Sequence, residues 1–520
     1  MLMRPAHVMA GALLALPWLW PFTSGPTAAV EPYLVAAAAA GLLLALWPRS
    51  AQAAAPTPSA AGIAAAGWLA AALVSSVIAL LQYFHLEARL FPWVDGSVPG
   101  QAFGNLRQTN LLATLLVIGL FSLRWWFGRM ARPSVAVRTA ALAAAALLLA
   151  ALAATASRVG IVELAFFALL ALVWARAEDR LPKQALVAAV ALTFYVLATL
   201  ALPWLLQSWQ HEAGRDLFDR LEHAESTCGS RLILWRNVLH LIALHPWTGW
   251  GWGQLKYAHY ITLFDGPRFC HILDNAHNLP LHLAVELGVP VALAACALAL
   301  WLIWRGRPWA ETDPARQLAW GVLGAVALHS MVEYPLWYGP FQIAALLGTG
   351  LLWRPQARTD SRPAPGRLGA WAGGARYALA ALLLAACAYA WWDYGRISQI
   401  YLPPSERASE YRDDPLTQAQ NSWLFAGAVR FAELTTQPPT RANAQWMLPA
   451  ALQSLHYSPE PSVIERVIES AAWLGQDDLA LAHMARYKAA FPKDYEAWTA
   501  RNRQVPEGAQ EGAQEDEPER

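Results

Sequence analysis

Charged residues are scarce in this chain: they make up 14% of its 520 residues, whereas hydrophobic residues make up 56%. A soluble protein of this length needs more charge on its surface. The composition therefore excludes an ordinary soluble globular protein and predicts an all-α polytopic membrane protein. The formal net charge of +1 says little about partners. We expect membrane lipid around the chain and no nucleic acid bound to it.

Cysteine is scarce as well, with four residues. Cys296 and Cys387 lie in apolar runs, whereas Cys228 and Cys270 lie in a polar loop. The loop pair can form a disulfide in an oxidising compartment, but two free thiols would look the same in sequence, so both alternatives stay open. The chain also lacks a signal peptide with an Ala-x-Ala cleavage site, and we expect the first apolar run to be retained as a span.

Long apolar runs are abundant. Those of roughly 17 to 25 residues, together with some shorter ones, predict about 11 transmembrane helices. They lie at 8–24, 30–48, 61–84, 107–127, 137–155, 159–176, 184–207, 279–304, 316–331, 336–353 and 375–394.

The orientation follows from the basic residues in the short connections, because Lys and Arg favour the cytoplasmic side. With a cytoplasmic N-terminus, the connections on that side carry most of these residues, from Arg4 and Arg49 to Arg305 and Arg367. The opposite connections hold few, namely Arg89, Arg107 and Arg158. We therefore predict that the C-terminus lies outside the cytoplasm.

Three regions follow from this topology. Residues 1–395 form the transmembrane domain, with one large external loop at about 207–278. Residues 396–504 form an external helical tail, where the spacing of small and aromatic residues before Phe491-Pro492 resembles a tetratricopeptide-like helix pair. Residues 505–520 are acidic, lack apolar anchors and are expected to be disordered.

Four polar patches stand on the external side, each just before a predicted helix: 104–110, 156–160, 229–231 and 274–278. The amide groups at a helix start carry partial positive charge and favour anions. Arg107, Arg158 and Arg231 add guanidinium forks that match phosphate oxygens in pairs. The alternative is that each arginine only reaches toward lipid headgroups. External arginines are disfavoured by the charge rule, which favours a phosphate-bearing ligand.

The histidines near 277 allow more than one interpretation. His271, His277 and His282 with Asp274 offer metal ligands, but His277 and His282 would face different sides of a helix and no HExxH pattern is present. We therefore expect no metal. His277 is either a polar residue at a helix end, with Asn278 or Asp274 as the cap, or a general base. Positive charge nearby disfavours the protonated imidazole and leaves a neutral ring that can take a proton.

The stretch "HNLPLHLAVELGVP" resembles the signature of the O-antigen ligase superfamily. That signature is a His followed by Asn, Ser or Gln, then nine residues and a Gly, here His277, Asn278 and Gly288. The position three after this glycine is Gly, Thr or Tyr in the family and Val291 here. The segments "SRVG", "GSRLILWRNVLHLIALHPWTGWGWGQL" and "HSMVEYPLWYGPF" add to the resemblance, which covers about 100–400.

The resemblance implies a GT-C-like glycosyltransferase that acts in the periplasm without a metal or other cofactor. Such enzymes transfer a glycan from undecaprenyl diphosphate by direct displacement, which inverts the sugar configuration. By resemblance, His277 is the base that deprotonates the acceptor, and Glu333 orients it. Arg158 and Arg231, with Arg107 nearby, hold the diphosphate and stabilise the charge of the leaving group.

The segment "EYPLWY" and the long tail look most like the PglL-type protein O-oligosaccharyltransferases. Tyr334, Tyr338 and Asn278 are then candidates for acceptor or glycan contact, and the acceptor is a Ser or Thr of a pilin-like periplasmic protein. The alternatives are an O-antigen ligase with lipid A core as acceptor, or an O-antigen polymerase. A transporter is an alternative of another class, but it would place charges in the middle of broken spans. The polar groups here gather at the outer surface. We therefore expect an enzyme of the bacterial inner membrane.

Overall fold

The computed structural model describes residues 5–47, 59–177, 180–210, 228–353 and 367–503. Within these ranges the chain is helical and has no strands, which confirms the predicted all-α class. The chain divides into two compact units. The first contains 1–224, 277–279 and 297–395, and the second contains 225–276, 280–296 and 396–520. The acidic segment predicted at 505–520 lies outside the described residues, as does part of the predicted external loop.

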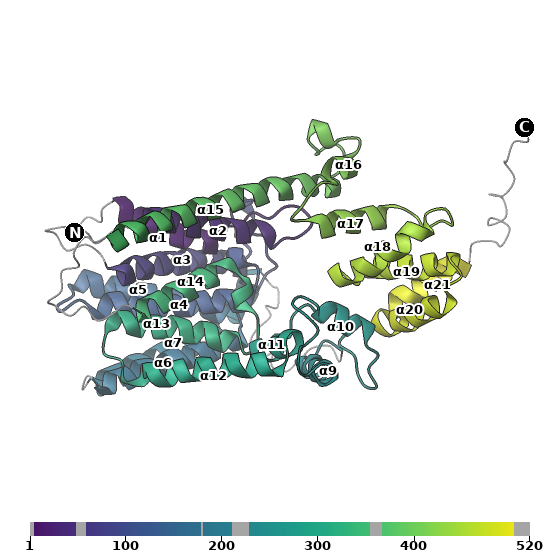
Figure 1. Cartoon of the computed structure of the whole chain (residues 1–520). Coiled ribbons are helices and arrows are strands. Elements are labelled where there is room, and N and C mark those ends of the chain that lie inside the picture. The colour runs from purple at the N-terminus through teal and green to yellow at the C-terminus, as the bar shows by residue number, and fades with distance from the viewer. Residues whose placement is uncertain (1–4, 48–58, 178–179, 211–227, 354–366, 504–520) are drawn as a thin grey trace, which may run out of the picture. The chain divides into compact units, whose positions relative to one another are not determined.

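The first unit consists of long apolar helices (Figure 1). They are α1 (Pro5–Leu19), α2 (Val30–Leu46), α3 (Ala60–Tyr83), α4 (Thr109–Gly128), α5 (Val135–Ala154), α6 (Arg158–Ala177), α7 (Leu181–Gln210), α13 (Pro314–His329), α14 (Gly339–Leu352) and most of α15 (Arg367–Ser398). Each of these coincides with a predicted apolar run. In the described part of the chain, seven helices are long and apolar enough to cross a membrane, and α1, α2 and α14 are shorter apolar helices. The chain is thus a multi-pass membrane protein.

Small residues let the helices of this unit approach closely. A Cβ added to Gly67 of α3 would lie 2.8 Å from the carbonyl oxygen of Gly11 in α1, and one added to Gly119 of α4 would lie 2.5 Å from the Cβ of Ala72 in α3. Helices in lipid gain little from the hydrophobic effect, so their association depends on such close packing. The fully buried side chains of α3 and α4, among them Trp68 and Leu115, form the centre of the core of this unit.

The predicted span at 279–304 is wrong in one respect, because two helices replace it: α11 (Leu279–Leu287) and α12 (Val289–Gly306). They separate at Gly288, whose φ is +88°. A Cβ at this position would clash with the carbonyl oxygen of Trp247, and the next amide, of Val289, donates to the carbonyl of Pro246 at 2.8 Å. The break therefore needs glycine. His282 and Glu286, which fall within the predicted span at 279–304, lie in the short helix α11.

The second unit joins the segment before α11 to the C-terminal tail. The segment forms α9 (Arg231–Leu244) and α10 (Leu255–Ile261). The tail forms α16 (Pro415–Ala419), α17 (Ala426–Thr436), α18 (Ala444–Tyr457), α19 (Pro461–Trp473), α20 (Asp477–Ala490) and α21 (Pro492–Arg503). The helical character expected of the tail is present in these residues.

One core serves both parts of this second unit. Tyr260 of α10 is buried among Met447, Val467 and Tyr487 of the tail. Its hydroxyl lies 2.8 Å from Nδ1 of His483 in α20. Burial, together with the charge of Arg486, lowers the pKa of His483 to about 4. The imidazole is therefore neutral at pH 7. The segment before α11 and the tail are thus one folded body.

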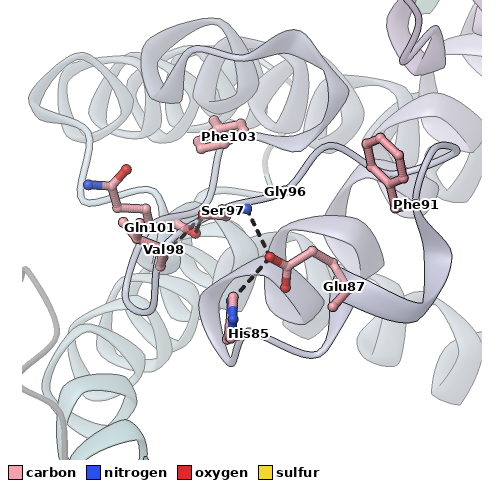
Figure 2. Close-up of a pocket in the computed structure, with 9 residues that line it drawn as sticks. His85, Glu87, Phe91, Gly96, Ser97, Val98, Gln101 and Phe103 are labelled. Carbon is pink, nitrogen blue, oxygen red and sulfur yellow. Dashed lines mark hydrogen bonds and ion pairs between the residues drawn. The ribbon is translucent and has the colours of Figure 1, made fainter.

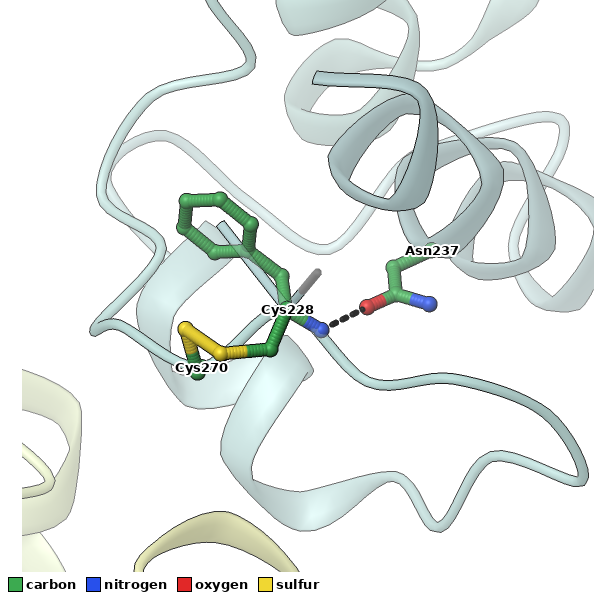
Figure 3. Close-up of a disulfide and its surroundings, with 4 residues drawn as sticks. Cys228, Asn237 and Cys270 are labelled. Atoms are coloured by element: carbon green, nitrogen blue, oxygen red, sulfur yellow. Dashed lines mark hydrogen bonds between the residues drawn. A yellow bond between two sulfur atoms is a disulfide. The ribbon is translucent and has the colours of Figure 1, made fainter. Parts of the chain in front are cut away.

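A disulfide joins Cys228 to Cys270, with their Cα atoms 5.3 Å apart (Figure 3). The amide of Cys270 donates to the carbonyl of Cys228 at 3.3 Å. Next to it, the amide of Phe269 donates to Oδ1 of Asn237 in α9 at 2.8 Å. The bridge ties the residues before α9 to the loop that follows α10, and it resolves the alternative that the sequence leaves open. Cys296 and Cys387 are free.

We expect the bridge to form in cells. Under denaturing, non-reducing conditions, a thiol-reactive polymer should label only the two free cysteines, and all four after reduction. Cys228→Ser should lower the free energy of unfolding of the second unit by about 2–4 kcal/mol, whereas Cys296→Ser, which removes a free thiol, serves as the matched control. Labelling of all four cysteines before reduction would show that the bridge is absent.

Candidate active site

His277 and Glu333 form the centre of the candidate site. His277 stands just before α11, and Glu333 lies in the turn after α13. Nδ1 of His277 lies 2.9 Å from Oε2 of Glu333, and their side chains are 25% and 7% exposed. A carboxylate only accepts hydrogen bonds, so Nδ1 donates and Nε2 keeps the lone pair that a base needs. The pairing predicted from the sequence is the one that the structure contains.

Backbone bonds hold the two turns together. The amide of Leu279 donates to the carbonyl of Ser330 at 2.8 Å, and the side-chain amide of Asn278 donates to the carbonyl of Met331 at 2.9 Å. Asn278, which we predicted to contact acceptor or glycan, therefore also fixes the turn that carries Glu333. The amide of Glu333 donates in turn to the carbonyl of His329 at the end of α13, at 2.9 Å.

The predicted tyrosines lie beside this pair. The ring of Tyr334 packs edge-on against the ring of His277, with centroids 5.0 Å apart. Tyr338 stacks on Tyr334 at 6.0 Å. Tyr334 therefore forms one wall of the site at the imidazole, and Tyr338 continues that wall.

Arg158 is connected to the pair through its neighbour in the chain. It is the first residue of α6 and is exposed, whereas Ser157 before it is buried. The Ser157 hydroxyl donates to Oδ1 of Asn110 at 2.7 Å, and Nδ2 of Asn110 lies 3.5 Å from Oε1 of Glu333. The amide of Gly160 donates to the Ser157 hydroxyl at 3.1 Å, so Ser157 caps the helix. A guanidinium at a capped helix start is suited to an anion.

Three of the four predicted polar patches contain a residue with left-handed backbone that is not glycine. These residues are Arg107, Ala156 and His277, with φ of +59°, +47° and +49°. This conformation costs about 1–3 kcal/mol per residue and persists where the surroundings impose it, often at functional sites. The sharp turns direct the chain into α4, α6 and α11.

Comparison with known proteins relates these residues to glycan ligases. Residues 143–296 match the family model described as O-Antigen ligase, 317–506 match Virulence factor membrane-bound polymerase, C-terminal, and 102–127 match Protein glycosylation ligase. The General O-oligosaccharyltransferase of Acinetobacter baylyi is 27% identical over 302 residues, which are 57% of this chain and 50% of that protein. The chain thus aligns with about half the length of this curated relative.

The chain is a relative of the O-antigen ligases. This confirms the resemblance predicted from the His277 motif. The three matched ranges contain, between them, every residue of the site. His277 and Arg158 fall in the O-antigen ligase match, Glu333 in the polymerase match, and Asn110 in the protein glycosylation ligase match.

The side chain of Arg107 bonds to other residues of the protein. Its guanidinium donates to Oδ1 of Asp95 at 2.9 Å and to the carbonyl of Pro21. Burial raises the pKa of Asp95, and the hydrogen bond and charge of Arg107 oppose that rise. These contacts join the loop before α4 to the end of α1. They give Arg107 a structural role that needs no ligand.

Arg231 belongs to the second unit. It is the first residue of α9, and Ser230 before it accepts from the amide of Leu232 at 3.2 Å. It stands three residues after Cys228, so the disulfide anchors the start of its helix. The helix start expected of an anion site is therefore present.

The other histidines have different surroundings. His282 lies 3.4 Å from Glu286 in α11, both buried. Burial raises the pKa of Glu286, against the lowering by the amides of Gly253 and Leu255. His271 is exposed and packs edge-on against Phe269. Among the residues that the structure describes, no group of three or more His, Cys, Asp and Glu side chains could hold a metal ion.

An open pocket of about 630 Å³, which we did not predict, lies in the loop between α3 and α4 (Figure 2). Its lining includes Phe91, Val98 and Phe103. Glu87 supports it from below: its Oε1 accepts from the amide of Ser97 at 2.9 Å.

We expect Arg107→Ala to destabilise the protein without weakening donor binding. Loss of its bonds to Asp95 and Pro21 should lower the free energy of unfolding by about 1–2 kcal/mol. The KM for the lipid-linked donor should stay at the wild-type value. Arg89→Ala, an exposed arginine of the same loop, serves as the control. A raised donor KM with unchanged thermal stability would instead place Arg107 at the diphosphate.

Proposed function

We propose that this protein transfers an oligosaccharide en bloc from undecaprenyl diphosphate to a Ser or Thr of a periplasmic protein such as a pilin. The observation that carries the proposal is the His277–Glu333 pair, linked through Asn110 and Ser157 to the helix start that bears Arg158. In such a site a hydrogen-bonded chain connects a base for a hydroxyl to the turn before α6, where Arg158 supplies a cation for a diphosphate. The relation to glycan ligases supports the class of reaction.

The chemistry requires one displacement. Nε2 of His277 takes the proton of the acceptor hydroxyl as its oxygen forms a bond to the anomeric carbon. The bond from that carbon to the diphosphate oxygen breaks, and its electron pair leaves with the undecaprenyl diphosphate. Glu333 stabilises the imidazolium that forms, in the way a carboxylate supports a catalytic histidine. Attack from the side opposite the leaving group inverts the sugar configuration, and no metal is needed for any of these steps.

Arg158 and Arg231 stabilise the negative charge that develops on the leaving diphosphate. Guanidinium groups bind phosphate oxygens in pairs, and both arginines open a helix, where the partial positive charge of the amides adds to theirs. Arg107 has its partners inside the protein, so in this proposal it shapes the loop beside the donor and does not hold the diphosphate.

The proposed orientation has the N-terminus in the cytoplasm and the site, the second unit and the C-terminus in the periplasm. The Cys228–Cys270 disulfide supports it, because disulfides persist in oxidising compartments. The bacterial inner membrane is then the location.

A protein acceptor is supported by two names among the relatives, a protein glycosylation ligase and a general O-oligosaccharyltransferase. Lipid A core, or a growing glycan, is the second candidate, because the O-antigen ligase and polymerase models also match. In the first case the helices α17–α21 would receive the acceptor protein, and Tyr334 and Tyr338 would contact the acceptor or the glycan.

The test supplies purified protein with a lipid-linked oligosaccharide and two acceptors, a pilin and a lipid A core. We expect glycosylated pilin, and loss of transfer of at least about 10²-fold in His277→Ala. Tyr33→Phe, an exposed residue of α2, serves as a control for substitution. Glycan on the lipid A core alone would establish the second candidate, and wild-type transfer by correctly inserted His277→Ala would remove it from the role of base.

Arg158→Ala should reduce transfer by about 10²-fold, the scale of losing one charge-stabilising donor. We expect Arg158→Lys to restore little, because an ammonium group makes no paired contact with phosphate oxygens. Arg176→Lys, near the other end of α6, is the matched control and should keep wild-type rates. Full transfer by Arg158→Lys would show that only the positive charge at this position matters, and that paired contacts with phosphate are not needed.

A further inference from the structure

Below the candidate site, three helices contribute polar side chains in two successive rows, all within the first unit. The outer row is Asn110 of α4, Ser157 before α6 and Glu333 after α13. The inner row is Thr114 of α4, Glu163 of α6 and His329 at the end of α13. Each member of the inner row lies four to six residues from its outer partner in the chain, about one to one and a half helical turns.

In the outer row, Asn110 occupies the middle. Its Oδ1 accepts from the hydroxyl of Ser157 at 2.7 Å, and its Nδ2 faces Oε1 of Glu333 at 3.5 Å. The other oxygen of Glu333 holds His277. One amide side chain therefore contacts both halves of the site: the turn that carries Arg158, and the carboxylate that orients the base.

In the inner row, the hydroxyl of Thr114 is the hub. It lies 2.8 Å from Oε1 of Glu163, 2.7 Å from Nδ1 of His329, and 3.1 Å from the carbonyl oxygen of Asn110. The hydroxyl has one proton, which the acceptor oxygens of Asn110 and Glu163 share, and the Thr114 oxygen can accept from Nδ1 of His329. Thr114, Glu163 and His329 have no exposed surface. They therefore fix α4, α6 and α13 in one register.

Helix packing alone does not require this inner row. Ionisable side chains are costly within a membrane and usually serve a function. Within the described residues, Oε2 of Glu163 is buried without a hydrogen-bond partner, a further cost. Apolar side chains of similar size would join the three helices more cheaply. Hydrogen bonds are directional, so the inner row fixes the rotation of each helix about its axis. This rotation in turn sets the position of the outer row.

We propose that Asn110 is a positioning residue that couples the His277–Glu333 pair to the Ser157–Arg158 turn, and that the Thr114–Glu163–His329 row holds it in place. Asn110 keeps the carboxylate aimed at the imidazole while Arg158 holds the donor, so that the acceptor oxygen and the anomeric carbon meet in register. Misplacement of reacting groups by about 1 Å can cost about 10²-fold in rate. This inference rests on the proposed function.

The test measures kcat and KM for transfer in purified variants. Asn110→Ala should lower kcat by about 10- to 100-fold, and Thr114→Val should lower it in the same direction. Ser122→Ala is the control: like Thr114, Ser122 is fully buried on α4, and it bonds to Ile118, away from the site. It should keep the wild-type kcat. A double variant of Asn110→Ala with Glu333→Gln should lose less than the product of the two single losses, because part of the effect of Asn110 runs through Glu333.

Asn110→Asp gives a readout that a merely structural role would not move. It sets a second carboxylate against Glu333, with His277 and the exposed Arg158 on the outer side and Glu163 and His329 below. Like charges so close raise the pKa of their pair, so the acid limb of the pH–rate profile should move to higher pH by about one unit. If Asn110→Ala fails to accumulate in the membrane, this profile decides.

Two results would overturn the inference: multiplicative losses in the double variant, or an unchanged acid limb in Asn110→Asp. Wild-type rates in Asn110→Ala while His277→Ala is inactive would overturn it and leave the proposed function intact. Wild-type transfer in His277→Ala would instead overturn the proposed function itself.

Discussion

The hydrogen bond between Nδ1 of His277 and Oε2 of Glu333 joins the turn before α11 to the turn after α13, and the contacts of Asn278, Leu279 and Asn110 hold these turns in place. In a membrane, a polar side chain without a partner is costly. The chain meets this constraint at helix ends, where backbone groups are already free to bond. Asn278 and Leu279 bond to the turn after α13, and Ser157 caps α6 while reaching Asn110. The residues of the candidate site thus lie at helix ends, and the same hydrogen bonds that pair the helix ends also position the site.

Hydropathy alone predicted most of the helices, because a helix that crosses a membrane needs a long apolar run. Every predicted run coincides with one or two helices. The break at Gly288 could not be read in this way. Its cause is the carbonyl of Trp247, forty-one residues earlier in the chain, which approaches too closely for any side chain. Likewise, nothing local in the tail indicates that Tyr260 enters its core, since that contact depends on how two distant segments pack. The periodicity of apolar residues predicts single helices, and it does not predict which distant helices pack together.

For the same reason, the sequence indicated some residues of the site and not others. His277, Arg158 and Glu333 were accessible from the sequence because a polar residue next to an apolar run is conspicuous, and the family motif named the histidine. Asn110 was within a predicted patch but had no role, and Thr114, Glu163 and His329 were missed. Each is a single polar residue within an apolar run, and only the packing of three helices shows that they meet. The sequence marked Arg107 as a ligand residue, and its contacts with Asp95 and Pro21 could not be read from the local pattern.

The shared core of the second unit has a consequence for biosynthesis. Tyr260 is made more than 180 residues before its partners in α18–α20, and domains fold as their residues emerge. The face of α10 that carries Tyr260 therefore stays exposed while α12 to α15 are inserted into the membrane. The tail closes over it last. Folding of the second unit is therefore completed only after the whole chain has been made, and a chain that ends early leaves the apolar face of α10 exposed.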